Sequence, residues 1–146
     1  MLIFAGANLQ NIKVNIKKDT SIFLGTILKG IEKIKGEEVV ILDLGNHIKN
    51  VCDYFIICTA NSSTQASAIG KEIERSVSKK LHQNPYSIEG TSHAEWILID
   101  YIDVVVHIFQ KHLRDFYNLE GMWADARKLS CNNLINNIEE GKKAHE

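Results

Sequence analysis

The chain has 146 residues, a formal net charge of −1, 45% hydrophobic residues and 24% charged residues. This size and balance predict one soluble globular domain, which can bury roughly two-thirds of its unfolded surface without disulfides or metal. The near-neutral charge excludes a globally basic nucleic-acid binder, and one Pro with nine Gly excludes a low-complexity chain.

The cysteines and the first residues bear on the cellular compartment. Cys52, Cys58 and Cys131 form no CxxC pair and no even set, which favours a reducing compartment. The start MLIFAGANLQ is too short and wrongly flanked for a signal peptide. No apolar run approaches the about 20 residues that cross a bilayer. We therefore expect a cytoplasmic protein.

The first third of the chain predicts a helix and a strand. Residues 1–19 carry little pattern, and we expect a peripheral arm there. Beyond them, apolar residues at steps of three and four predict a helix with Thr20 or Ser21 as its cap and Gly36 as its end: Leu24, Ile27, Leu28, Ile31 and Ile34. The run EVVILDLG that follows is rich in β-branched residues and predicts a strand covered on both faces.

The segment Asp53–Ala60, DYFIICTA, predicts a second strand that leads directly into a second helix. Ser62 with Gln65 three residues later fits a capping box, and apolar residues then recur every four positions: Ile69, Ile73, Val77 and Leu81. The dipeptide Asn84-Pro85 ends this helix. YSIEG predicts a short strand, and residues 91–94 predict a loop.

The remaining elements complete one domain. The stretch Glu95–Gln110, EWILIDYIDVVVHIFQ, predicts two strands folded into a hairpin. KHLRDFYNLEGMWADA predicts a short helix, a break at Gly121 and a final turn, and the tail predicts a frayed helix on Leu134 and Ile138. The fold class is therefore α/β (α+β), a single domain with a mixed β-sheet and helices mainly on one face.

A two-residue loop at Ile102-Asp103 would fix which side chains share a face of the hairpin. One face is aliphatic and predicts core contact: Ile97, Ile99, Tyr101, Val104, Val106 and Ile108. The other, the mixed face, carries large apolar groups with one carboxylate and one imidazole: Trp96, Leu98, Asp100, Val105, His107 and Phe109. Because Ile102 resists the positive φ of a tight turn, we expect a bulge or a wider turn.

The mixed face has two interpretations. An aromatic-rich surface with a few polar groups has the composition of a protein–protein interface. In the alternative, a helix of the same chain covers the face and Asp100 pairs with His107. We favour the interface, because a buried face does not normally accept an Asp and a His without partners.

One feature suggests an enzyme instead. The strand, turn and helix around Ala60–Gln65 direct backbone N–H groups outward, as an anion-binding helix N-terminus does. A nucleotide-binding enzyme of nucleotidyltransferase type could use Ser62 and Ser63 there together with Asp100. Helix capping explains both serines, however. Cys58 lies in an apolar strand, which predicts a buried and inert thiol.

The sequence predicts no cofactor and no metal site, because it holds no Walker A, GxGxxG or HExxH pattern. The basic pair Lys79-Lys80 is too small for a nucleic-acid footprint and predicts a solvated helix face.

Four blocks, in this order and spacing, resemble the Iojap family of ribosomal silencing factors (RsfS): DYFIICTANSSTQ, IEG, EWILIDYIDVVVHIF and LRDFYNLEGMWADA. The resemblance runs from about Leu28 to Ala126. It implies an Iojap/RsfS-like domain over residues 20–128, after the arm at 1–19 and before the tail at 129–146. It also implies a fold like that of nucleotidyltransferases without their catalytic signature, and therefore a binding protein that is not an enzyme.

The resemblance further implies a partner. Members of the family bind the large ribosomal subunit through its protein number fourteen and block joining of the small subunit, which represses translation when nutrients are scarce. The partner-binding positions implied here are Trp96, Leu98, Asp100, Tyr101, Asp103, Val105 and His107. Other matching positions suggest a clamp of the last helix on the sheet: Arg114, Tyr117, Leu119 and Trp123. We expect no membrane and no specific nucleic-acid sequence as a partner, and the sequence leaves a homodimer open.

Overall fold

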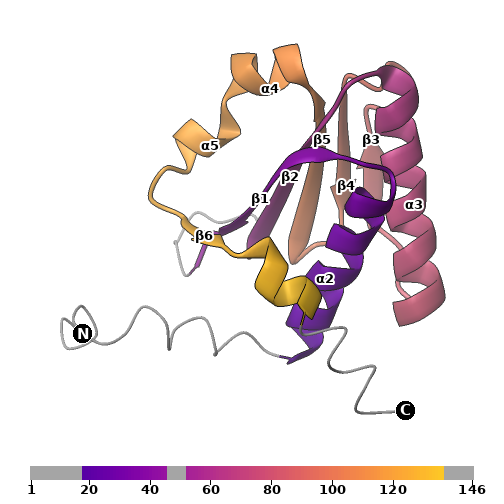
Figure 1. Cartoon of the computed structure of the whole chain (residues 1–146), viewed down its shortest axis with the longest axis vertical. Helices are drawn as coiled ribbons and strands as arrows, with labels where there is room; N and C mark the ends of the chain where they lie inside the picture. The colour runs from indigo at the N-terminus through magenta and orange to yellow at the C-terminus, as the bar shows by residue number, and fades with distance from the viewer. Residues whose placement is uncertain (1–17, 46–51, 137–146) are drawn as a thin grey trace.

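A computed structural model describes residues 18–45 and 52–136. In this part of the chain a mixed sheet runs in the order β3-β4-β5-β2-β1-β6 (Figure 1). Its strands are β1 (Glu37–Asp43), β2 (Tyr54–Ala60), β3 (Ser87–Glu89), β4 (Trp96–Asp100), β5 (Val104–Gln110) and β6 (Arg127–Leu129). The helices are α2 (Lys18–Lys33), α3 (Ser63–Leu81), α4 (Lys111–Tyr117) and α5 (Leu119–Met122). The predicted mixed α/β domain is confirmed.

The centre of the sheet is the parallel pair of β2 and β5, and the other neighbouring strands run antiparallel. Because parallel strands need a crossover, α3 carries the chain over one face of the sheet between them. The cap of α3 is the predicted one, since the Ser62 hydroxyl accepts a hydrogen bond from the Gln65 N–H. The side-chain oxygen of Gln65 accepts a hydrogen bond from the backbone N–H of Asn61, not from that of Ser62.

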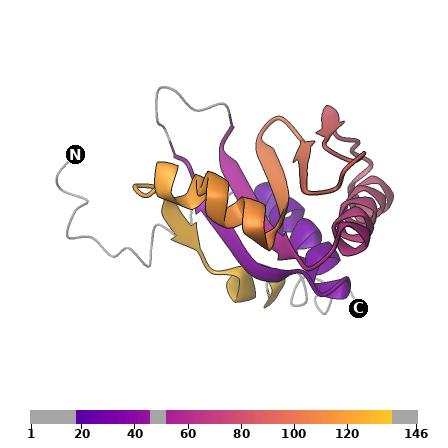
Figure 2. The same cartoon turned by 90° about the horizontal axis from the view of Figure 1, so that it is seen from above.

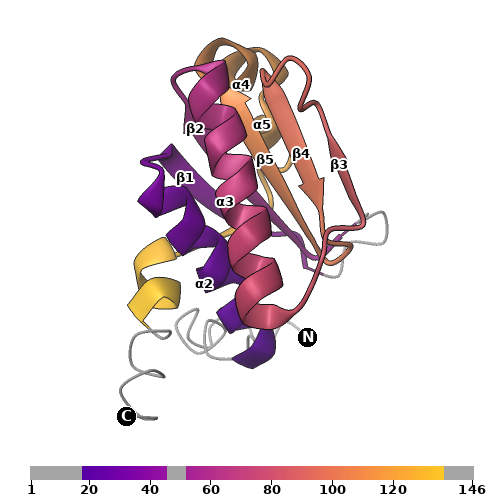
Figure 3. The same ribbon diagram turned by 90° about the vertical axis from the view of Figure 1, so that its right-hand side faces the viewer.

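The main hydrophobic core lies between the sheet and the helices α2 and α3, which pack side by side on one face (Figure 3). Its members include the predicted stripe of α2 and the aliphatic face of the hairpin. A short helical stretch over residues 131–136 adds Leu134, which is 5% exposed, to the same core. The helices are therefore mainly on one face, as predicted.

A second, smaller core lies on the opposite face of the sheet, where α4 and α5 cross over the strands (Figure 2). Buried strand residues such as Leu42, Phe55 and Phe109 form it. Leu113 and Trp123 pack against it from the segment that contains α4 and α5. This segment covers only part of the face, since Trp96 and Val105 stay half-buried beside this core.

Several local predictions need correction or completion. The break after α4 lies at Asn118, whose φ is +46°, and Gly121 lies inside α5. The sequence did not predict β6, a three-residue edge strand that pairs with β1 and ends at the buried Leu129. The predicted arm covers residues 1–19. Residues 1–17 lie outside the described residues, whereas Lys18 and Asp19 already belong to α2, so neither Thr20 nor Ser21 is the cap of this helix. Ile138 of the predicted tail helix also lies outside the described residues. Among the described helices, none is long and apolar enough to cross a membrane.

Candidate functional site

The predicted register of the hairpin is confirmed. Ile97 pairs with Ile108 and Ile99 with Val106, while Tyr101 donates its N–H to the Val104 carbonyl at 2.9 Å. This register places the aliphatic face against α2 and α3, where its members are buried. The mixed face consequently lies on the side of the sheet that α4 and α5 cover in part.

Tyr101 does not reach the mixed face. Because side chains alternate along a strand, its ring belongs to the aliphatic face, where it is 9% exposed and meets Phe23 edge-on at 5.1 Å between ring centroids. Its hydroxyl is buried without a hydrogen-bond partner. The implied role of Tyr101 as a surface contact therefore disagrees with its position in this structure.

Trp96 is half-buried and is held by its neighbours. Its indole stacks on Phe109 at 4.8 Å between ring centroids and lies 4.7 Å from the ring of Tyr117 on α4. The indole Nε1–H donates a hydrogen bond to His107 Nδ1 at 3.1 Å. The indole is thus fixed in orientation while part of its surface stays open to solvent.

His107 is buried, with 4% of its surface exposed, and packs edge-on against Phe55. Burial lowers the pKa of its imidazole from 6.5 to about 4, so the ring is neutral at pH 7. Because Nδ1 accepts from Trp96, the proton resides on Nε2, which has no hydrogen-bond partner. The resemblance implies His107 as a surface contact, but the structure buries this ring. His107 instead orients the indole of Trp96 through their hydrogen bond.

Asp100 stabilises the hairpin turn and does not pair with His107. Its Oδ1 accepts a hydrogen bond from the Ile102 N–H at 2.7 Å. Asp100 lies opposite Val105, whereas His107 lies opposite Leu98. The internal ion pair of the alternative interpretation is therefore absent, although its covering helix is present in part.

The hairpin turn is tighter than expected. Ile102 adopts a φ of +75°, and the Asp103 N–H donates to the Tyr101 carbonyl at 3.0 Å, which is a γ-turn centred on Ile102. The expected bulge or wider turn is thus wrong. The carboxylate of Asp100 and the central strands secure this conformation, since the Asp103 carbonyl accepts N–H groups from Asp53 and Tyr54.

The half-buried residues of the mixed face are Trp96, Leu98, Asp100 and Val105, and Asp103 is exposed at the turn. The α4–α5 segment also carries exposed apolar side chains: Phe116 at 78%, Tyr117 at 44% and Met122 at 74% exposure. Tyr117 joins the two groups, because its ring contacts both Trp96 and Phe116. Sequence reasoning missed this extension, since it assigned Tyr117 to a clamp. Helical spacing alone could not show which side of α4 faces solvent.

The predicted clamp is confirmed at its other members. Arg114 is 7% exposed, and its guanidinium donates to Glu120 Oε1 and Thr59 Oγ1, both at 2.8 Å. It also donates to the Glu38 carbonyl. Trp123 meets Phe55 edge-on at 5.8 Å, and Leu119 joins the same core. These contacts anchor the α4–α5 segment next to the mixed face.

The residues of the alternative enzyme site are not brought together. Asp100 pairs with Val105 near the start of β5, whereas Ser62 follows Ala60, which pairs with Gln110 at its end. Val105 and Gln110 are five residues apart along β5, which is about 17 Å at about 3.3 Å per residue. The Ser62 hydroxyl is engaged in its cap, and burial raises the pKa of the Cys58 thiol to about 12. Among the described residues, no group of His, Cys, Asp and Glu could hold a metal ion.

Comparison with known proteins gives a consistent result. A family model described as RsfS, "Ribosomal silencing factor during starvation", matches residues 17–146. The ribosomal silencing factor RsfS of Halalkalibacterium halodurans is 37% identical over 108 residues, which are 74% of this chain and 91% of that protein. The factor of Bacillus subtilis is 42% identical over 63% of this chain and 76% of its own length. The chloroplastic Iojap protein of Zea mays is 34% identical over 73% of this chain and 46% of its own.

Solved structures agree with the fold. A crystal structure of a Bacillus halodurans protein superposes with a TM-score of 0.62 at 34% identity, covering 73% of this chain and 95% of that one. A Chromobacterium violaceum protein gives a TM-score of 0.66 at 27% identity, covering 79% and 92%.

Proposed function

This chain belongs to the RsfS family of ribosomal silencing factors, and we propose that it binds the large ribosomal subunit through protein number fourteen of that subunit. In this proposal the bound protein occupies the surface that the small subunit needs, and translation is repressed. The family supports a ribosome-associated silencing role; the contact surface and the mechanism are our inference. We place this role in the cytoplasm.

The observation that carries the proposal is that Trp96 is partly exposed and yet fixed in orientation. The indole is half-exposed, yet Phe109 stacks beneath it and His107 fixes its N–H. A large aromatic side chain that is already ordered loses little conformational entropy on binding, which makes it a favourable anchor. Leu98 and Val105 are half-buried on the same face, and Tyr117 and Phe116 continue the apolar surface onto α4.

The proposed mechanism is steric. A stable interface buries roughly 1,600 Å² in total, and a few central residues carry most of its energy. Trp96 and Leu98 insert into the partner, while Asp100 faces a cationic group of the ribosomal protein. The protein then works by occupying a surface, and no covalent bond is made or broken.

Binding of folded variants to purified large subunits tests the surface. We expect Trp96→Ala to lose on the order of 2 kcal/mol, about 30-fold in affinity. The matched control is Tyr86→Ala, which removes an aromatic side chain that is 77% exposed next to β3, and its affinity should stay within twofold. If Trp96→Ala is folded and binds as well as the wild type, the mixed face is not the contact surface.

The charge of Asp100 needs its own variant, because its carboxylate also holds the turn. Asp100→Asn keeps an oxygen that can accept from the Ile102 N–H and removes only the charge. We expect it to bind more weakly, with a slower association rate at low salt. An affinity and a salt dependence equal to those of the wild type would exclude a cationic partner group at this position.

A further inference from the structure

A second surface lies on the face of the sheet that α2 and α3 cover, along the contact between these two helices. A Cβ built at Gly30 would lie 3.4 Å from a side-chain carbon of Ile73, so the two helices approach closely there. This contact brings Lys29 and Lys33 of α2 next to Lys79 and Lys80 of α3. The pair Lys79-Lys80, which seemed too small for a footprint in sequence, is therefore part of a larger basic group.

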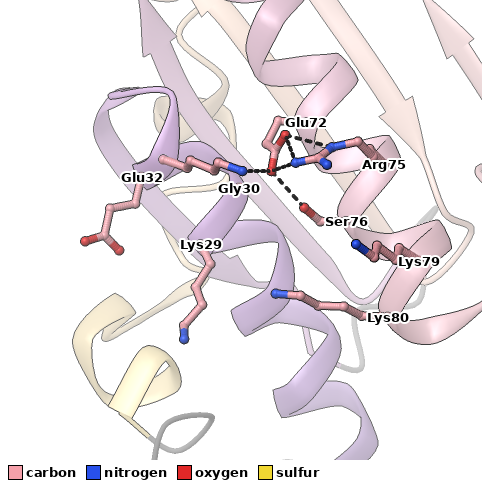
Figure 4. A pocket seen from close by; sticks show the side chains of 9 residues that line it. Lys29, Gly30, Glu32, Glu72, Arg75, Ser76, Lys79 and Lys80 are labelled. Carbon is pink, nitrogen blue, oxygen red and sulfur yellow. Dashed lines mark hydrogen bonds and ion pairs between the residues drawn. The ribbon is translucent and has the colours of Figure 1, made fainter.

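These side chains line a groove of about 670 Å³ between the helices (Figure 4). Its lining comprises Lys29, Gly30, Glu32, Lys33, Glu72, Arg75, Ser76, Lys79 and Lys80. Figure 4 shows Lys80 extending from α3 toward α2. Five cationic and two acidic side chains meet here in a chain whose net charge is −1.

Glu72 neutralises part of the positive charge of the groove, because its carboxylate pairs with Arg75 and Lys33. Its carboxylate accepts two bonds from Arg75 Nη2 at 2.8 and 2.9 Å, one from Ser76 Oγ at 3.2 Å, and pairs with Lys33 Nζ at 3.2 Å. Hydrogen bonding by Arg75, with smaller contributions from Lys33 and Ser76, lowers the pKa of Glu72. Glu72 thus links the two helices and orders Arg75 and Lys33, and the lining holds five cationic side chains against two acidic ones.

We propose that this groove binds the backbone phosphates of RNA. Lys29 and Lys33, like Arg75 and Lys79, are four residues apart, so each helix presents cations at steps of about one helical turn, 5.4 Å. Two such rows along an open groove suit a chain of phosphates better than one enclosed anion. Contacts of this kind carry no sequence information and add affinity that falls steeply with salt.

The inference extends the proposed function, on which it rests for the identity of the RNA as ribosomal. The sheet separates α2 and α3 from the mixed face, so one molecule can hold RNA phosphates and a protein partner at the same time. The groove would then strengthen attachment to the ribosome through charge, while the mixed face supplies specificity.

Fluorescence anisotropy with a labelled single-stranded RNA, titrated between 50 and 200 mM salt, tests the groove without any ribosome. The test variant is Lys79→Ala/Lys80→Ala. The control, Lys71→Ala/Lys128→Ala, removes the same charge from an exposed position of α3 outside the groove and from β6. We expect the test variant to flatten the slope of log affinity against log salt by about 1.4 and the control to leave it unchanged.

The outcomes separate this inference from the proposed function. Equal slopes for the two double variants, or no RNA binding by the wild type at 50 mM salt, would overturn the proposal that the groove binds RNA. Neither result would bear on the proposal that the mixed face binds the ribosomal protein. Saturable binding of inorganic phosphate or a nucleoside triphosphate without RNA binding would overturn it as well. Trp96→Ala should bind the RNA like the wild type, because its site lies on the other face of the sheet.

Discussion

The indole N–H of Trp96 on β4 donates to Nδ1 of His107 on β5 at 3.1 Å, although the strand partner of His107 is Leu98. The bond therefore runs diagonally across the hairpin and joins a half-exposed ring to a buried one. It fixes the imidazole as the neutral Nε2–H form and fixes the plane of the indole. One buried, uncharged histidine thus supports the residue that we place at the centre of the binding surface.

The burial of His107 predicts a loss of stability in mild acid. Its pKa falls from 6.5 in the unfolded chain to about 4 in the fold, so between these values the unfolded state binds more protons. The contribution of His107 is fully present above pH 6.5 and is lost as the pH falls toward 4, in total about 3 kcal/mol. Urea unfolding between pH 4.5 and 7.5 measures the free energy of unfolding over this window.

His107→Gln is the test variant for this window, because glutamine can accept from Trp96 and does not titrate. Its free energy of unfolding should depend less on pH than that of the wild type. His93→Gln, at an exposed histidine, should reproduce the wild-type profile. Parallel profiles for the wild type and His107→Gln would show that His107 is not held neutral by burial.

The turn at Ile102 predicts a stabilising substitution. Its φ of +75° is costly for a β-branched residue, and its side chain is 62% exposed, so little apolar burial is lost on truncation. Ile102→Gly should raise the free energy of unfolding by about 1 kcal/mol. Ile102→Ala, which keeps a Cβ at the same φ, should gain less. Thermal and urea unfolding of the two variants compare them, and a less stable glycine variant would contradict the strained turn.

The same substitution by aspartate should have different effects at the adjacent residues Leu98 and Ile99 of β4. Ile99 is 0% exposed, and Ile99→Asp should cost more than about 4 kcal/mol and prevent folding, because it buries an unpaired carboxylate. Leu98 is half-buried on the other face, so Leu98→Asp should fold and lose binding to large subunits. Circular dichroism and the binding assay separate the two effects. A folded Ile99→Asp protein would refute the register of the hairpin.

The buried contacts of Arg114 predict that its replacement by alanine destabilises the fold and that replacement by lysine does so as well. Arg114→Ala leaves Glu120, Thr59 and the Glu38 carbonyl without their donor, at a cost of about 3 kcal/mol. Arg114→Lys should recover less than half, because one ammonium cannot reproduce the planar fork. Arg75→Ala, which removes a guanidinium from a side chain that is 58% exposed, should cost less than about 1 kcal/mol. Chemical denaturation measures all three, and full rescue by lysine would contradict the clamp.

Apolar patterning predicted the longer elements α2, α3, β1, β2, β4 and β5 and the two faces of the hairpin, because buried positions recur with the period of the helix or strand that carries them. The stripe of α2, the cap at Ser62 and the pairing of Ile99 with Val106 all follow from local patterns. The position of the break at Asn118 does not follow from a local pattern. Both asparagine and glycine can adopt the left-handed conformation, so the sequence does not show whether Asn118 or Gly121 adopts it. β6 is too short to carry a pattern, and its pairing with β1 depends on tertiary contact.

The site was predictable in composition but not in its internal arrangement. Alternation placed Trp96, Leu98 and Asp100 on one face, and it also turned Tyr101 inward against the implied role. The bond between Trp96 and His107 and the contact of Trp96 with Tyr117 arise from side-chain packing, which strand periodicity does not encode. The basic groove could not be predicted either, because Lys29 and Lys80 come to line one groove only when α2 and α3 pack together.

Light scattering of ribosomal subunit joining tests the central claim most directly. Purified large subunits, preincubated with the protein, are mixed with small subunits, and the rise in scattering reports joining. We predict that the wild type and Tyr86→Ala suppress this rise, whereas folded Trp96→Ala and Leu98→Asp at the same concentration leave it intact. Suppression by both folded mixed-face variants equal to that of the wild type would contradict the account.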